Sequence, residues 1–212
     1  MNWLLQNSDK FWAYTEVHLA LALIPVVAGL VIAIPLGWLA SRSRSARAVL
    51  LALSNILYTI PSIALIVIAP AVLGTRILDG VNVIVPLTIY TVALLVRGIA
   101  DALAAVPGHV VAAANAMGFR PLRRFLTVEF PLAVPVIIAG LRVATVSNIS
   151  LVSVGALVGI SGYGQLFTEG FQSNFPTKIW IGLIATLVLA LLADALLLLL
   201  GRFLTPWVRV GR

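Results

Sequence analysis

Long apolar runs separated by short polar segments dominate the chain. Each run is at least as long as the roughly 20 residues that a helix needs to cross a hydrocarbon core of about 30 Å. The runs lie at residues 17–40, 48–73, 81–100, 132–160 and 179–200. Prolines inside them are compatible with membrane helices, because neighbouring helices and hydroxyl side chains can satisfy the freed carbonyl groups. We therefore predict an all-α membrane protein with five transmembrane helices.

The composition supports this assignment and excludes several classes of function. Hydrophobic residues make up 61% and charged residues only 10% of the 212 residues, whereas a soluble domain carries about a quarter charged residues. Cysteine is absent, and the two histidines, His18 and His109, are far apart. We expect no disulfide, no thiol nucleophile, no metal site and no cofactor. An enzyme would need a convergent acid, base or metal cluster, which the sequence does not offer.

Arginine is concentrated on one side of the predicted bundle. If the chain alternates across the membrane, nine arginines share that side: Arg42, Arg44, Arg47, Arg120, Arg123, Arg124, Arg202, Arg209 and Arg212. The opposite side holds Lys10, Arg76 and Lys178. The positive-inside rule places the arginine-rich side in the cytoplasm, so the net charge of +7 indicates topology rather than nucleic-acid binding.

This orientation divides the chain into three parts. Residues 1–16 form an extracytoplasmic segment, which lacks the basic region of a cleavable signal peptide. Residues 17–200 form the transmembrane domain, and residues 201–212 form a cytoplasmic tail. The amino terminus is therefore expected outside and the carboxyl terminus inside.

Residues 101–131, between the third and fourth runs, are unusually polar for this chain. Residues 101–117 favour one helix, and Gly118 suits the left-handed position that follows a helix end. Pro121 suits the first turn of a second short helix. Pro131 then marks the start of the fourth span. We predict a cytoplasmic loop built from two helices.

The second of these helices is amphipathic. Leu122 shares one face with Phe125 and Leu126, because the three stand at helical spacing. The neighbouring basic residues point elsewhere: Arg120, Arg123 and Arg124. Two interpretations remain open. The helix lies on the lipid of the inner leaflet, or it is a knob whose apolar face fills a groove in another cytoplasmic protein.

The same segment resembles the loop motif of the integral subunits of ABC importers, Glu-Ala-Ala, three residues, Gly, nine residues, Ile, any residue, Leu-Pro. This chain has Ala112-Ala113-Ala114, then Gly118, then Val128-Glu129-Phe130-Pro131 at matching spacing, and Ala112 replaces the glutamate. In that family the loop forms a coupling helix in a cleft of a cytoplasmic ATPase subunit. The resemblance implies these ATPase-coupling residues: Ala113, Ala114, Gly118, Phe119, Arg120, Pro121, Leu122, Arg123, Arg124, Phe125 and Pro131.

Two further stretches, residues 58–74 and 155–171, resemble permeases for osmoprotectants such as glycine betaine, carnitine and choline. The resemblance implies a type I importer permease fold in a bacterial cell membrane. It also implies a second permease subunit, identical or paralogous, two ATPase subunits and an extracytoplasmic substrate-binding protein. The chain has no Gly-x-x-x-x-Gly-Lys-Ser/Thr loop. ATP hydrolysis is therefore expected on the partner, and this subunit is not expected to be an enzyme.

Other substrates and mechanisms stay open at this point. Permeases for methionine and other amino acids share the loop motif, so an amino-acid substrate is the alternative. A stand-alone secondary transporter would need ion-coupling carboxylates deep in the membrane. Asp194 is the one candidate.

Several polar residues interrupt the second and fourth runs and are candidates for the lining of a solute pathway: Asn55, Tyr58, Thr59, Ser62, Thr145 and Asn148. Ordinary hydrogen bonding between helices is the other interpretation. The ring of Tyr58 offers a quaternary ammonium group a cation–π contact.

Charged residues inside spans need partners. Arg97 and Asp101 stand four residues apart and can pair on one helix face. Arg142 and Asp194 lie toward the inner ends of their spans and can meet across two helices. Each pair is a structural contact or a gate latch.

One aromatic pattern lies outside the runs. In the outer segment 161–178, aromatic side chains recur at every fourth position, at Tyr163, Phe167, Phe171 and Phe175. This spacing predicts one stripe on a helix. The stripe would rest on lipid or the bundle, or form a lip that contacts the binding protein.

Overall fold

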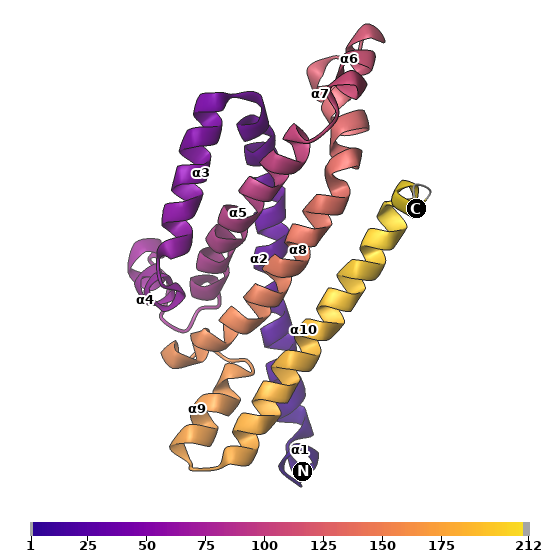
Figure 1. Ribbon diagram of the computed structural model, residues 1–212. Helices are drawn as coiled ribbons and strands as arrows, with labels where there is room; N and C mark the ends of the chain where they lie inside the picture. The colour runs from indigo at the N-terminus through magenta and orange to yellow at the C-terminus, as the bar shows by residue number, and fades with distance from the viewer. Residues whose placement is uncertain (1, 210–212) are drawn as a thin grey trace.

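The computed structural model describes residues 2–209, and every regular element in that range is a helix (Figure 1). The helices are α1 (Asn2–Gln6), α2 (Ser8–Arg42), α3 (Arg44–Thr59), α4 (Ser62–Leu73), α5 (Val81–Ala104), α6 (Gly108–Ala116), α7 (Pro121–Arg124), a π-helix (Phe125–Glu129), α8 (Phe130–Val152), a 3₁₀ helix (Ser153–Val158), α9 (Gly164–Gln172), α10 (Pro176–Leu204) and a 3₁₀ turn (Pro206–Arg209).

Four continuous helical segments are long and apolar enough to cross a membrane: α2, α5, the run Pro121–Val158, and α10. A fifth crossing requires α3 and α4 together, and these two helices meet at an angle of 98°. The all-helical architecture is as predicted, but the second span is not one straight helix over 48–73. Ile60 adopts an extended conformation at the break, because Pro61 disfavours the helical region for the residue before it.

A stripe of small residues brings α2 against α5. Ala33 and Ala40 are buried on this stripe, and Gly29 and Gly37 lie between and beside them. A Cβ atom on Gly29 would lie 2.4 Å from Cγ2 of Thr91, which no real contact tolerates. Small residues are how membrane helices approach closely without a hydrophobic driving force. The contact between α2 and α5 is also the most extensive between any two helices of the described residues.

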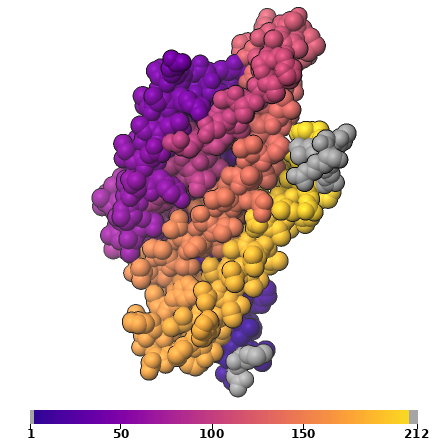
Figure 2. Space-filling model, in the orientation of Figure 1, coloured from indigo at the N-terminus to yellow at the C-terminus, as the bar shows by residue number. Residues whose placement is uncertain are grey.

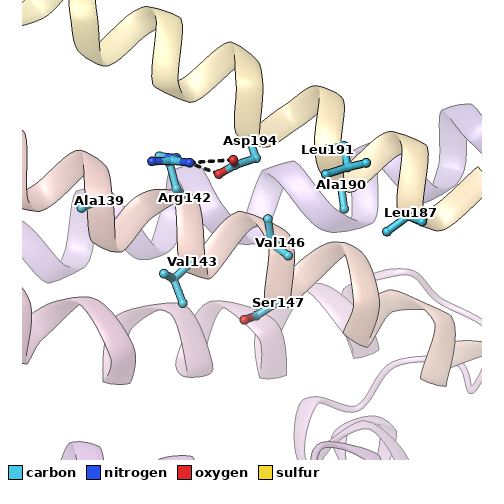
Figure 3. A pocket seen from close by; sticks show the side chains of 9 residues that line it. All are labelled: Ala139, Arg142, Val143, Val146, Ser147, Leu187, Ala190, Leu191 and Asp194. Atoms are coloured by element: carbon cyan, nitrogen blue, oxygen red, sulfur yellow. Dashed lines mark hydrogen bonds and ion pairs between the residues drawn. The ribbon is translucent and has the colours of Figure 1, made fainter.

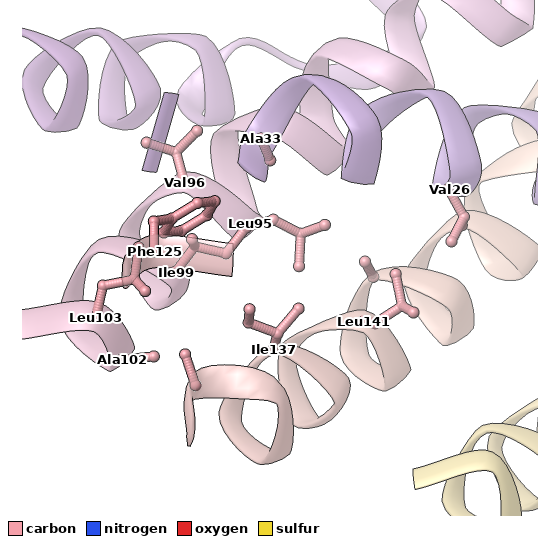
Figure 4. Packing of buried hydrophobic residues seen from close by; sticks show 12 residues of the cluster. Val26, Ala33, Leu95, Val96, Ile99, Ala102, Leu103, Phe125, Ile137 and Leu141 are labelled. Carbon is pink, nitrogen blue, oxygen red and sulfur yellow. The ribbon is translucent and has the colours of Figure 1, made fainter. Parts of the chain in front are cut away.

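The remaining long helices form a row in front of α2. Helix α3 packs on α5, α5 on α8, and α8 on α10, while α2 packs behind α3, α5 and α8 (Figure 1). A cluster of buried aliphatic side chains from α2, α5 and α8 fills the centre (Figure 4). Helix α10 lies at one side of the row and is the most exposed of the long helices (Figure 2).

Several predicted boundaries differ from the structure. The first span begins at Ser8, so most of the predicted extracytoplasmic segment 1–16 is helical and continuous with it. At 35 residues, α2 is about 50 Å long, which exceeds the hydrocarbon core. The helical run that contains the fourth span begins at Pro121 and not at 132. The predicted tail 201–212 continues α10 to Leu204, and Arg212 lies outside the described residues.

The predicted aromatic stripe does not form. Helix α9 ends at Gln172, so Phe175 lies beyond it. Tyr163 precedes the helix and is buried against His18, with ring centroids 4.7 Å apart. Phe171 is 82% exposed. The prediction from the four-residue spacing is wrong because helix α9 covers only part of the segment.

Candidate functional site

Helices α6 and α7 form a hairpin that projects beyond the bundle at the end opposite the amino terminus (Figures 1 and 2). The predicted helix over 101–117 is two helices, because α5 ends at Ala104 and α6 begins after Pro107. Gly118 ends the segment with a φ of +78°, in the left-handed region as predicted. Pro121 occupies the first position of α7, also as predicted. We call residues 108–126 the hairpin.

The structure divides the predicted coupling residues by exposure. Ala113, Gly118, Arg120, Pro121, Leu122 and Arg123 are exposed, and Phe119 and Pro131 are half-buried. Two apolar side chains at the tip are strongly exposed, Met117 at 68% and Leu122 at 59%. The Arg123 guanidinium lies over the Phe119 ring, 4.7 Å from its centroid. Ala114, Arg124 and Phe125 are buried.

Phe125 does not belong to the exposed face of the amphipathic helix. Its ring packs against Trp38, at 5.2 Å between centroids, and against Phe130, at 5.7 Å. It joins the buried aliphatic cluster beside Leu103 (Figure 4). The prediction assumed an α-helical period, but α7 passes after four residues into a π-helix. Its wider turn rotates Phe125 inward, while Leu122 and Leu126 stay exposed.

Arg124 likewise points inward, where it holds a buried carboxylate. Its Nε donates to Oε1 of Glu129 at 2.6 Å, and its Nη1 donates to Oδ1 of Asn115 in α6. Arg42, at the end of α2, donates from Nη2 to both oxygens of Glu129, at 2.9 and 2.8 Å. The Glu129 side chain keeps only 6% of its surface exposed. We call Glu129 with Arg42, Arg124 and Asn115 the inner clamp.

Sequence reasoning missed the inner clamp. The available signal was that Glu129 is the only acidic residue between Asp101 and Glu169. A single carboxylate beside an apolar run is expected to be paired when buried. In the family motif this position is an arbitrary residue between two apolar ones.

The predicted pathway residues separate into two groups. Asn55, Tyr58 and Thr59 are exposed on α3. Ser62 is half-buried and starts α4 after the bend, so it does not continue the α3 face.

Thr145 and Asn148 are buried inside the bundle and do not line an open face. Asn148 Nδ2 donates to Oγ1 of Thr91 at 2.9 Å, which ties α8 to α5. The Thr145 hydroxyl donates to the carbonyl of Leu141 at 2.8 Å. For these two residues, hydrogen bonding within and between helices is the better interpretation.

The two predicted charge pairs have different outcomes. Arg142 and Asp194 meet as predicted, with Nε to Oδ1 and Nη2 to Oδ2 both at 2.7 Å (Figure 3). The Arg97–Asp101 pair is wrong. Asp101 accepts from Arg47 of α3, and Arg97 donates to Oδ1 of Asn55 at 3.2 Å. Helix α3 packs closely enough on α5 to offer both residues better partners than the helix itself.

Several of these polar groups adjoin one another across the row of helices. Tyr58 and Ser147 line the same shallow pocket between α3, α5 and α8. Ser147 also lines a cavity of about 610 Å³ with Arg142 and Asp194. Asn55 and Arg97 extend the surface toward the hairpin end. We call these residues the polar face: Asn55, Tyr58, Arg97, Arg142, Ser147 and Asp194.

A second carboxylate ties the helices at the opposite end. Glu169 of α9 accepts from Lys10 Nζ at 2.9 Å, from Tyr14 Oη at 2.9 Å and from Lys178 Nζ at 3.0 Å. Burial alone would raise the pKa of the Glu169 carboxyl, but these hydrogen bonds together hold its pKa below the ordinary value. We call Glu169 with Lys10, Tyr14 and Lys178 the outer clamp.

Within residues 2–209, no group of three histidine, cysteine or acidic side chains converges to hold a metal ion. His18 is fully buried. Its Nε2 donates to the carbonyl of Ile149 at 2.9 Å, and its Nδ1 accepts from the backbone N–H of Tyr163. His18 therefore joins α2 to α8 and to the segment before α9.

Comparison with known proteins agrees with this geometry. The chain is 29% identical over 206 residues to the choline transport system permease protein OpuBB of Bacillus subtilis (strain 168), covering 97% of this chain and 94% of that protein. It is 33% identical over 192 residues to the osmoprotectant import permease protein OsmY of Salmonella typhimurium (strain LT2), covering 89% and 80%.

The solved structure of the inward-facing MetNI methionine ABC transporter superposes with a TM-score of 0.79 at 25% identity, covering 93% of this chain and 97% of that chain. The fold is thus the type I ABC importer permease fold. The family described as binding-protein-dependent transport system inner membrane component matches residues 26–210. The chain therefore belongs to this family of inner-membrane proteins, the permease subunits of ABC importers, which work with ATPase and substrate-binding partners.

Proposed function

We propose that this chain is the permease subunit of an ATP-driven importer for osmoprotectants that carry a quaternary ammonium group: glycine betaine, carnitine or choline. Two relatives at 29% and 33% identity are described as permeases for choline and for osmoprotectants. The methionine transporter is similar at 25% identity, so methionine is the second candidate. The hairpin carries the coupling part of this proposal, because it is exposed at its tip and anchored at its base.

The tip has the surface of a docking element. Met117, Leu122 and Leu126 expose apolar side chains beyond the bundle, and Arg120 and Arg123 stand beside them. Exposed apolar residues with a basic rim are typical of a protein contact rather than of a free surface. The occupant that we propose is a groove of the cytoplasmic ATPase subunit.

The base of the hairpin gives it the stiffness to transmit force. Helix α7 runs through the π-helix into α8 without interruption. Glu129 links this junction to Arg42 of α2 and, through Arg124, to α6. A displacement of the tip therefore moves α8 and the end of α2 as one unit. Rigid-body movement of packed helices is how such bundles change access from one side to the other.

The polar face is where we place the solute pathway. Charged side chains in membrane helices almost always face a bundle interior or a water-filled cavity, and here Arg97, Arg142 and Asp194 all lie on one side of the row. The exposed residues of α4 and of the far side of α2 are aliphatic and suit lipid. A second permease subunit, identical or paralogous, would close the polar face into a pathway.

The complete assembly in this proposal has two permease subunits, two ATPase subunits and one binding protein. The hairpin and the arginine-rich loops face the cytoplasm. The outer clamp and the amino terminus face the binding protein. This orientation rests on the positive-inside rule.

The test is a solute panel on the reconstituted transporter. The permease, its ATPase and its binding protein are assembled in proteoliposomes, and ATP hydrolysis is measured with glycine betaine, carnitine, choline or methionine. We expect at least one of the first three to stimulate hydrolysis, and methionine to leave it at the basal rate. Stimulation by methionine alone would overturn the substrate assignment. Solute movement without any ATPase would overturn the importer assignment.

A further inference from the structure

The cavity of about 610 Å³ between α8 and α10 contains a charged pair in largely aliphatic surroundings (Figure 3). Its volume falls in the range of small-molecule sites, roughly 300–1,000 Å³. Arg142 and Asp194 keep 33% and 30% of their side-chain surfaces exposed. Ser147 is the other polar residue in the lining. The cavity thus combines one positive group, one negative group and apolar walls.

The pair has unused hydrogen-bonding capacity. Arg142 donates to Asp194 from Nε and Nη2, and a guanidinium has five N–H donors in all. In the part of the chain that the structure describes, Arg142 makes no other hydrogen bond. Each Asp194 oxygen accepts one bond and retains a second lone-pair direction. An incoming carboxylate can therefore bind Arg142 while an incoming cation approaches Asp194, and the pair itself stays intact.

A neighbouring cavity shows what these charges add. About 540 Å³ lies between α2, α8 and α10, and its lining is aliphatic except for Thr145. The Thr145 hydroxyl is already committed to Leu141. This groove offers a charged solute no partner and fits lipid chains. The charged cavity on the other side of α10 is chemically distinct.

We propose that the Arg142–Asp194 cavity is a low-affinity solute site within the membrane, selective for zwitterions that carry both a carboxylate and a quaternary ammonium group. The solute carboxylate binds Arg142 through charge-assisted hydrogen bonds. The quaternary ammonium lies beside Asp194, and its methyl groups contact Val146 and Leu191. The inference rests on the proposed function and adds a rule to it. Glycine betaine and carnitine use both charges, whereas choline, which has no carboxylate, uses Asp194 alone.

The first test compares two solutes in the same variant. The double variant Arg142→Gln, Asp194→Asn removes both charges and leaves no charge unpaired. Arg142→Gln alone removes the proposed partner of the solute carboxylate. In reconstituted transporters we expect Arg142→Gln to lower glycine betaine uptake relative to choline uptake by about tenfold, the loss of one charge-assisted contact. Arg142→Lys should recover part of that ratio. A purely structural ion pair would lower uptake of both solutes equally and leave the ratio unchanged.

The second test measures occupancy and does not depend on uptake. The chain has no cysteine, so a single cysteine can be placed on the cavity wall as Val143→Cys, a site that is 56% exposed. A matched control is Leu78→Cys, which is 66% exposed in the loop between α4 and α5. In the assembled transporter, a water-soluble cationic thiol reagent should label both, and glycine betaine should slow labelling only at residue 143. Adding Arg142→Gln should abolish this protection.

The outcomes separate this inference from the proposed function. If the cavity cysteine is not labelled, or is labelled at the same rate with and without a transported betaine, the membrane site is wrong and the importer assignment stands. An unchanged betaine-to-choline ratio in Arg142→Gln would overturn the selectivity rule in the same way. If no quaternary ammonium solute stimulates the wild-type transporter, the proposed function itself fails.

Discussion

Each end of this permease is held by one glutamate that binds two basic residues, but the two glutamates lie in different surroundings. At the hairpin end, Glu129 gathers Arg42 and Arg124 and is 6% exposed. At the opposite end, Glu169 gathers Lys10 and Lys178 and is 26% exposed. The inner clamp uses arginines, whose planar groups suit buried carboxylates, and the outer clamp uses lysines, whose compact ammonium groups hydrate strongly where they reach water. The difference predicts a stiff inner end and a more adaptable outer end.

Physical reasons favour this division of roles. A buried ion pair holds a fixed geometry, because separating it leaves an uncompensated charge in a low dielectric. A partly exposed pair is screened by water and salt and contributes little. Force transmission to α8 needs the first property. Contact with a separate binding protein, in the proposed orientation, tolerates the second.

Of the variants that test this comparison, Glu129→Gln should lower the stability of the protein most. The substitution leaves the buried Arg124 without its counter-charge, so we expect a loss of about 3–5 kcal/mol in stability. The thermal unfolding midpoint of the purified protein measures it. Uptake per ATP hydrolysed should fall as well, because the hairpin loses its link to α2. A change no larger than that caused by Glu169→Gln would show that the two ends are equivalent.

Gly118→Ala should have an intermediate effect at the same end. The left-handed φ of +78° is costly for alanine, while no atom lies within 4 Å of the added Cβ. We expect a loss of about 1 kcal/mol from the backbone alone. Gly98→Ala is the matched control, because its surroundings are equally open and its backbone is helical. Equal midpoints for the two variants would contradict the argument.

Glu169→Gln should have the smallest effect, about 1 kcal/mol or less, and this effect should shrink further in high salt. The unfolding midpoint at low and high ionic strength tests both statements. Glu129→Gln should be nearly insensitive to salt, since the Glu129 carboxylate and Arg124 are buried. A salt-independent loss at residue 169 would mean that the outer clamp is as protected as the inner one.

The effect of Glu169→Gln on stability depends on pH, and the sign of this dependence is defined. The pKa of Glu169 is lowered in the folded protein, so its stabilisation is present above the ordinary glutamate range of about 4 and is lost as pH falls through the folded pKa. The midpoint difference between wild type and Glu169→Gln should be constant near neutral pH and vanish in acid. A difference that grows on acidification would have the wrong sign.

The sequence was sufficient for features that depend on composition and local spacing. The apolar runs predicted the spans, and Gly118 and Pro121 predicted the turn and the start of α7. Arg142 and Asp194 pair as predicted, because each is an isolated charge in an apolar run. The motif spacing located the hairpin. Each of these signals lies in one short stretch or in a residue type that admits few partners.

Features that depend on packing could not be predicted from the sequence in the same way. Phe125 and Arg124 lie inward at the junction of α7 with a π-helix, and the residue pattern of this stretch carries no signal for a π-helix. Asn148 binds Thr91 of α5 and Thr145 binds the backbone of its own helix, and a polar residue in an apolar run looks the same whether it faces a helix or water. Asp101 pairs with Arg47 rather than with Arg97 because α3 packs beside α5, and only the tertiary fold defines that contact.

The central claim is that the hairpin tip is where a separate ATPase drives this bundle, and the rates of solute uptake and of solute-stimulated ATP hydrolysis in Leu122→Asp test it most directly. Leu78→Asp, on a comparably exposed leucine at the other end of the bundle, is the control. We expect Leu122→Asp to lower solute uptake and solute-stimulated hydrolysis by at least about tenfold, and Leu78→Asp to retain both. Wild-type uptake in Leu122→Asp and in Arg123→Glu would contradict the claim and place the hairpin on the lipid surface instead.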